Sequence, residues 1–215
     1  MGRLVRFLVF AAVLWSGYWF AAGYGLRSSI TGWFRNQSEQ GWQADFADIS
    51  TSGYPLEHVT LLISPALADP VTGAAWRSDS LIFVSPAFWP GRQSVRFADT
   101  PQLLSYFDQT AIIEAEAMQA DLVLKPGIAL ELERMALTSG PWSVLGSDAD
   151  VAAAQDLTVS MTQQIEPEIY AFSVKASAFA PGETLRAVMG SAPSLPPEFE
   201  ALELDVTVHF DRPWD

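Results

Sequence analysis

Histidines are the first residues in this chain to examine for metal or acid–base chemistry. The two histidines, His58 and His209, lie far apart and do not form a metal-ligand spacing such as His-x-x-x-His. His58 precedes the apolar run Val59–Ile63, and His209 falls on the polar side of an alternating segment. We therefore predict that both are solvated surface residues.

Carboxylates occur in groups whose spacing is compatible with chemistry. Asp148, Asp150 and Asp156 lack the turn glycine and distal glutamate of a calcium loop. Glutamates also pair at i, i+2 and would share one face of a strand, where a cleft could use them as an acid and a base. Because the other face of these strands is apolar, we interpret the glutamates as the solvated side. These pairs are Glu114 with Glu116, and Glu131 with Glu133.

Motifs for other reactions are missing from the sequence. The chain has no cysteine, so it has no disulfide, zinc-thiolate site or cysteine nucleophile. It also lacks a Gly-x-Ser-x-Gly elbow, a phosphate-binding glycine loop and a dinucleotide fingerprint. We therefore predict a protein that is not an enzyme and has no catalytic residue, cofactor site or metal site.

Composition and charge narrow the class of partner. Apolar residues make up 49% and charged residues 17% of the 215 residues, which excludes an intrinsically disordered chain. Three of the 12 Lys and Arg residues lie before residue 28 and none of the 25 acids does, so residues 28–215 carry a net charge of −16. Such a body would be repelled by phosphate backbones, so we expect no nucleic-acid partner.

The amino terminus predicts a membrane anchor. Phe7–Leu26 is uncharged for 20 residues, which is about 30 Å as a helix and matches the hydrocarbon core. With Arg3 and Arg6 before it and an acidic body after it, the positive-inside rule puts Met1 in the cytoplasm. Tyr18, Trp19 and Tyr24 would then fall near the outer interface, whereas Trp15 gets no such explanation. A cleaved signal peptide ending at residues 21–23 is the alternative, and both interpretations export the body.

The helix is expected to continue past the membrane. Ile30, Trp33 and Phe34 repeat at helical spacing within residues 27–41, and Gly41 is a plausible C′ residue. We expect this apolar stripe to pack against the body. The predicted organisation is a cytoplasmic stub with a transmembrane signal-anchor helix (1–26), an amphipathic helix (27–41) and a β-rich domain (42–215).

Beyond Gly41 the hydrophobic period changes to two, which is typical of strands. A phase slip near Glu133–Arg134 predicts a β-bulge, and a short helix is expected around Glu183–Met189, followed by a loop at 192–197. The alternating segments are 118–124, 128–137, 157–161, 170–176 and 202–210.

Short turns between successive strands favour an antiparallel meander. The predicted fold class is mainly β, a β-rich α+β protein with a curved, mostly antiparallel sheet. Such a sheet must hide its apolar face. It would do so either in a closed sandwich under a second layer, or as an inner face that stays partly open for apolar ligands.

Several short motifs, taken in order along nearly the whole chain, resemble a known family. They are Leu14–Phe20, Gly41–Ala44, Ser50–Pro55, Ala68–Pro70 with Ala75-Trp76, Trp89-Pro90 and Phe210–Trp214. Their order is similar to that of an uncharacterised bacterial membrane-protein family, domain-of-unknown-function family 2125, which is related to the AsmA-like proteins.

The resemblance implies an inner-membrane anchor with a periplasmic β-rich body. AsmA-like relatives build curved sheets with an apolar groove and are linked to phospholipid traffic or outer-membrane homeostasis. We therefore expect a non-enzymatic envelope protein that handles phospholipid or another acyl-chain ligand. The alternative is an anchored scaffold or assembly factor whose acidic face or sheet edge binds a protein partner. The predicted groove residues are Leu130, Leu132, Leu204, Val206 and Val208.

The last strand carries an expectation of its own. Family members continue beyond the position of Trp214, so this chain is expected to be a fragment or a short member. In a fragment, Leu202–Phe210 would lie at or near a sheet edge with one ladder side unpaired. Its apolar face would then be incompletely buried.

Overall fold

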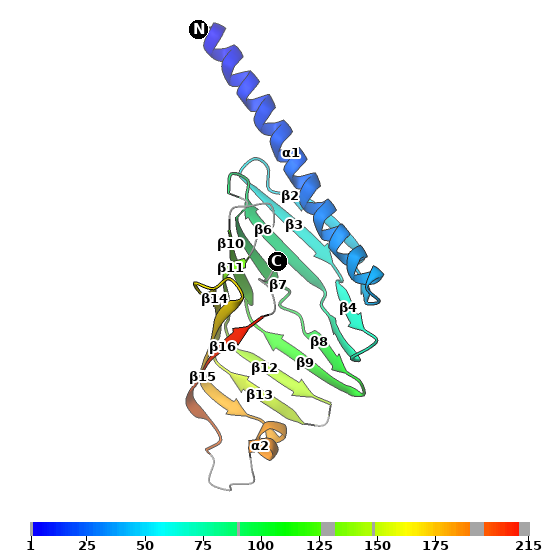
Figure 1. Cartoon of the computed structure of the whole chain (residues 1–215), viewed down its shortest axis with the longest axis vertical. Helices are drawn as coiled ribbons and strands as arrows, with labels where there is room; N and C mark the ends of the chain where they lie inside the picture. Colours follow the sequence, from blue (N-terminus) through cyan, green and yellow to red (C-terminus); the bar gives the residue numbers. More distant parts are fainter. Residues whose placement is uncertain (1, 90, 126–131, 148, 190–195, 211–215) are drawn as a thin grey trace.

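A computed structural model describes residues 2–89, 91–125, 132–147, 149–189 and 196–210. Two helices, α1 (Gly2–Glu39) and α2 (Glu183–Met189), accompany a 16-stranded sheet in these residues (Figure 1). The strands are β1 (Gln43–Asp45), β2 (Asp48–Ser52), β3 (Glu57–Ile63), β4 (Ala66–Asp69), β5 (Ala74–Arg77), β6 (Ser80–Pro86), β7 (Arg92–Phe97), β8 (Gln102–Tyr106), β9 (Gln109–Ala115), β10 (Gln119–Leu124), β11 (Leu132–Ser139), β12 (Trp142–Gly146), β13 (Asp150–Ala154), β14 (Leu157–Gln163), β15 (Ile169–Pro181) and β16 (Phe199–His209).

The sheet is a meander of long strands, and most of these are divided into two shorter strands, one in each half of the sheet. One half of the sheet has the order β1-β4-β5-β8-β9-β12-β13-β15, and the other half has the order β2-β3-β6-β7-β10-β11-β14-β15. The 13-residue β15 belongs to both halves and pairs with β16 along its other side. The pairings are antiparallel, as the short turns predicted.

A crease runs across the sheet where the two pieces of each long strand meet. Three residues along it have positive φ angles: Ser64 (51°), Ala117 (48°) and Ala178 (48°). Such bulged residues bend a strand and shift its side-chain alternation by one position. The shift keeps the apolar side chains of both halves on one face. Ala154 on one side of the crease and Ala176 on the other accordingly share one apolar cluster with Phe179.

The two faces of the sheet differ sharply in polarity. A register row of one face runs through Leu122, Met135, Met161, Phe172 and Val206 on five neighbouring strands. The row one residue further along belongs to the other face and consists of Asp121, Ala136, Ser160, Ser173 and Asp205. The predicted alternation of apolar and polar residues is therefore confirmed.

Several local predictions are also confirmed. Val123 pairs with Arg134 and Leu124 with Leu132, which leaves Glu133 as the extra residue of the predicted bulge. The helix expected at Glu183–Met189 is α2. Most of the loop expected at 192–197 lies outside the described residues. A closed sandwich is wrong for the described part of the chain, because these strands form one curved sheet (Figure 1).

Helix α1 continues without interruption past residue 26, as predicted, and ends in a Schellman motif. Gly41, with φ of 96°, donates its N–H to Ser38 O (3.1 Å), and Trp42 donates to Gln37 O (3.1 Å). The left-handed φ is one that glycine adopts without strain. Phe34 is buried, and its ring contacts Phe46 with centroids 5.0 Å apart, so this part of the predicted stripe packs on the body, whereas Trp33 is 47% exposed.

Asp156, in the turn between β13 and β14, bonds to β15 at the crease. Its Oδ1 accepts from the Ser177 backbone N–H (2.9 Å) and its Oδ2 from the Ser177 hydroxyl (2.6 Å). The Ser177 hydroxyl, followed by its N–H, lowers the pKa of Asp156 below its ordinary value. Because the folded pKa is depressed, the stabilisation is complete above the unfolded pKa of about 3.9 and is lost as pH falls through the folded value.

We predict that Asp156→Asn unfolds at a lower urea concentration than the parent at pH 7. The difference between the two midpoints should shrink as the pH falls below about 4, since the parent carboxylate then becomes protonated. Urea titrations of the detergent-solubilised chain at both pH values measure this difference. The exposed Asp205→Asn serves as the control, and a difference that stays constant with pH would contradict the role of the charge.

Candidate functional site

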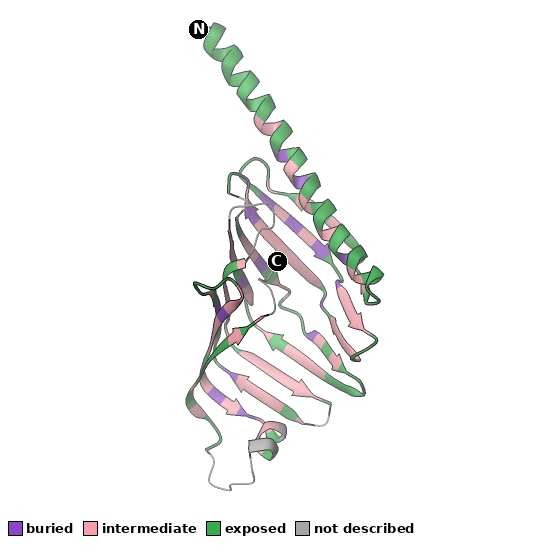
Figure 2. Ribbon diagram, viewed as in Figure 1, coloured by how far each residue is buried: buried purple, intermediate pink, exposed green. Residues whose placement is uncertain are grey.

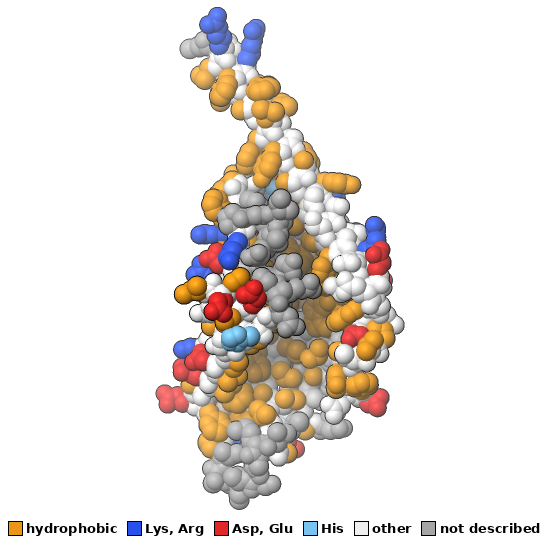
Figure 3. Space-filling model, viewed as in Figure 1, with side chains coloured by type: hydrophobic (Ala, Val, Ile, Leu, Met, Phe, Trp, Pro, Cys, Tyr) orange, Lys and Arg blue, Asp and Glu red, His pale blue; other side chains and the backbone are white. Residues whose placement is uncertain are grey.

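The curved apolar face forms the candidate site, here called the trough. Figure 3 shows a hollow lined by hydrophobic side chains between α1 on one side and β16 on the other. The alternation of side chains places Leu122, Met135 and Met161 on this face in one half of the sheet. In the other half, beyond the crease, it places the paired Trp76 and Leu104 there.

Burial within the trough is uneven (Figure 2). Met161 is 1% exposed and Val95 9%, so parts of its wall are closed. In contrast, Leu204 is 53% exposed, Val206 43% and Leu104 41%. Solvent contact of this size on a large aliphatic side chain leaves apolar area that a ligand would remove from water.

The structure places four of the five predicted groove residues, and the fifth, Leu130, lies outside the described residues. Leu204, Val206 and Val208 pair with Val174, Phe172 and Tyr170 and therefore share the trough face. Leu204 and Val206 are exposed, whereas Val208 and Leu132 are half-buried. The Tyr170 hydroxyl donates to Leu132 O (3.4 Å). The buried Tyr170 therefore contacts Leu132 on β11 and pairs with Val208 on β16.

Strand β16 behaves as expected for an edge strand. It pairs with β15 along Ile169–Ser177 and Phe179, and in the described residues no other strand pairs with its outer side. The apolar face of β16 is incompletely covered, as the exposures of Leu204 and Val206 show.

The junction between α1 and the body was missed by the sequence analysis. The Trp15 indole N–H donates to Pro55 O (3.0 Å), and Ser16 Oγ shares a hydrogen bond with the Tyr54 hydroxyl (2.8 Å). One turn further along α1, the Trp19 indole N–H donates to Glu57 O (3.0 Å). Trp15, which no membrane argument explained, therefore has a partner in the body.

The prediction of a surface histidine is wrong for His58. Its side chain is 5% exposed, it stacks on Trp19 with ring centroids 4.7 Å apart, and its Nε2 donates to Trp19 O (3.0 Å). The sequence position of His58 could have predicted its burial. It lies two residues before Thr60 and four before Leu62, so the three side chains share one face of β3, and all three are buried. Trp19 itself is 5% exposed because it packs against the body. The exposed His209 is as predicted.

A sequence family matches most of the chain, including the trough and the junction with α1 from Trp19 onward. The profile of DUF2125, described as an uncharacterized protein conserved in bacteria, matches residues 19–215. The chain belongs to this family. No curated protein and no solved structure matches it.

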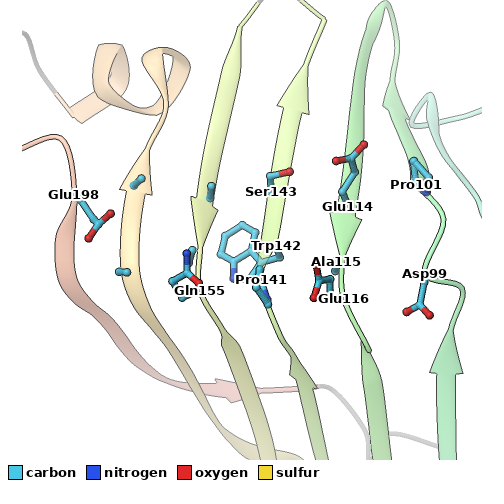
Figure 4. A pocket seen from close by; sticks show the side chains of 14 residues that line it. Asp99, Pro101, Glu114, Ala115, Glu116, Pro141, Trp142, Ser143, Gln155 and Glu198 are labelled. Carbon is cyan, nitrogen blue, oxygen red and sulfur yellow. The ribbon is translucent and has the colours of Figure 1, made fainter.

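Acidic residues of this DUF2125 protein lie around a depression of about 540 Å³ at the crease (Figure 4). Glu114, Ser143 and Ala153 form a register row along it, and Trp142 also lines it. Glu114 and Glu116 are exposed, in agreement with their interpretation as solvated residues, whereas Glu131 and Asp148 lie outside the described residues. Among the residues that the structure describes, no three His, Asp or Glu side chains are grouped to hold a metal ion.

Gly23 offers a direct test of the junction. A Cβ there would meet His58 Cδ2 at 3.4 Å and Thr51 Cγ2 at 3.6 Å, whereas no such atom lies within 4 Å at Gly25. We predict that Gly23→Leu destabilises the DUF2125 protein by about 1–3 kcal/mol through overpacking. Gly25→Leu adds the same side chain on the free side of α1 and should not lower stability, because leucine is a better helix former than glycine. Thermal unfolding of the solubilised chain measures both, and equal losses would contradict this docking.

Proposed function

We propose that this DUF2125 protein is a non-enzymatic protein of the bacterial envelope that holds lipid acyl chains in the trough. The observation that carries the proposal is the pair Leu204 and Val206. They are 53% and 43% exposed although they belong to the same apolar face as the buried Met161. A closed core would have covered them, so this surface suits an apolar ligand.

The membrane anchor in this proposal is α1. It is long and apolar enough to cross a membrane, and Figure 2 shows its amino-terminal part exposed all round. Arg3 and Arg6 at its start favour an amino terminus in the cytoplasm, and therefore an inner-membrane protein whose body lies in the periplasm. Lipid would then be available at the membrane that α1 crosses.

The chemistry of the trough suits an acyl chain better than a polar substrate. Each CH₂ group transferred from water into an apolar surface contributes about 0.8 kcal/mol, so several contacts suffice for binding without a catalytic group. The described acids around the depression in Figure 4 include the exposed Glu114 and Glu116, and the alternation of β9 places Glu114 on the face opposite to the trough residue Leu104.

We predict that Leu204→Asp strongly reduces the lipid that co-purifies with the protein, because a carboxylate would lie against the acyl chain. Thr207→Asp adds the same charge to the polar face of β16 and is the matched control. Mass spectrometry of lipids in gently solubilised samples, normalised to protein, compares the two variants with the parent. Since Leu204 is already exposed, both variants should fold, and circular dichroism checks this. Equal lipid content in all three proteins would refute the proposal.

The outer edge of β16 favours a second candidate function, that of a scaffold for a protein partner. In the described residues this 11-residue strand pairs on one side, so another chain could add a strand to it. We predict that a photo-crosslinking residue at Glu203 captures one defined protein in cells, whereas one at Thr72, in the turn between β4 and β5, does not. Absence of a specific product at Glu203 would count against a scaffold.

A further inference from the structure

Two turns beside α1 expose large apolar side chains. These turns, here called the tips, are Gly53–Leu56 between β2 and β3 and Ala87–Trp89 after β6. Both tips are uncharged. Their exposed fractions are 51% for Tyr54, 67% for Leu56, 68% for Phe88 and 55% for Trp89. A cluster of this kind at one end of a domain is typical of a surface that meets another apolar phase.

The docking of α1 sets the height of the tips relative to the membrane. Tyr54 and Pro55 bond to Ser16 and Trp15, and Ala87 O accepts from the Tyr18 hydroxyl (2.8 Å). These helix residues lie inside the uncharged stretch Phe7–Leu26. Along the axis, Trp19 and Trp15 are about 10 and 16 Å from the outer end of that stretch. If α1 spans the bilayer, the tips beside these residues lie below the outer membrane surface.

Backbone hydrogen bonding in the tips is suited to an environment without water. Two tip carbonyls, those of Pro55 and Ala87, and the carbonyl of the adjoining Glu57 accept from side chains of α1. Within the body, Ala87 N–H donates to Leu56 O (2.9 Å) and Glu57 N–H donates to Gly53 O (3.2 Å). A turn that enters hydrocarbon must satisfy its polar backbone groups internally, because lipid offers no partners.

Charged residues next to the tips limit how deeply the body can enter the hydrocarbon. Glu57 and Arg92 are the first charges on the body side of the two tips, and both are exposed. Burying either in hydrocarbon would be costly. Because Glu57 O accepts from the Trp19 indole, the outer boundary of the hydrocarbon would lie near Trp19, which leaves Trp15 about 6 Å inside it. Penetration would then be confined to the tips, with the strands outside the hydrocarbon.

We propose that the tips insert into the outer leaflet of the membrane that α1 crosses. This end of the trough then opens directly to lipid acyl chains. The inference rests on the proposed function only for the membrane span of α1. It does not require that the trough carries a lipid.

Site-directed depth measurement tests the inference on the full chain. The natural chain has no cysteine, so Leu56→Cys and Phe88→Cys each provide one labelling site. Val71→Cys is the control, because Val71 is 87% exposed in the turn between β4 and β5, on the far side of the crease from the tips. Each variant carries an environment-sensitive fluorophore and is reconstituted into phosphatidylcholine–phosphatidylglycerol vesicles. Some of these vesicles contain nitroxide-labelled lipid.

We expect blue-shifted emission and strong quenching by the nitroxide lipid at Leu56→Cys and Phe88→Cys. Val71→Cys should instead be quenched by aqueous iodide. Tip labels that iodide quenches as strongly as the Val71 label, with no response to nitroxide lipid, would overturn the inference. Tip insertion without co-purifying lipid would leave the inference standing and refute the lipid function. Lipid in the trough with no tip insertion would overturn the inference alone.

Discussion

Alternation of side chains along a strand is the constraint on which this structure depends, because the sheet has one apolar face to hide. A strand that bent at the crease without an extra residue would turn its apolar side chains outward in one half. Bulged residues such as Ala117 and Ala178 prevent this. As a result, Trp76 and Leu104 beyond the crease continue the face that begins with Met135 and Met161. The trough is a direct consequence of that continuity.

The two edges of the sheet differ in how far they are covered. At one edge, α1 covers the start of the meander, and its Trp15 and Trp19 donate to backbone carbonyls of the body. His58 fills the space beneath α1, where it contacts Trp19 and faces Gly23. At the other edge, β16 presents apolar side chains and an outer ladder side that the described residues leave unpaired. The protein is therefore closed where it meets its own helix and open where a ligand or another chain would approach.

Lipid handling and membrane insertion would use one continuous apolar surface. The amino-terminal part of α1 is exposed, and the tips beside its middle expose Leu56 and Phe88. On the far side of the trough, Leu204 of β16 lies on the apolar face of the sheet. The acids that give the body its negative charge include Asp121 and Asp205, which lie in a register row on the other face of the sheet. Such a separation of polarity suits a protein that lies beside a bilayer and keeps one face in water.

The local sequence pattern was sufficient to predict the helices and strands, but not the distant residues that they contact. Alternation predicted the strands and the bulge at Glu133, and a glycine predicted the end of α1, because these features depend on neighbouring residues. The same pattern placed Leu204 and Val206 on the apolar face, but the exposure of each depends on how the strands curve. His58 was misjudged because its partner Trp19 is 39 residues away, and the partner of Trp15 is 40 residues away. Contacts of that range form only when the helix docks on the folded sheet, so the junction and the position of the tips along α1 belong to the tertiary structure.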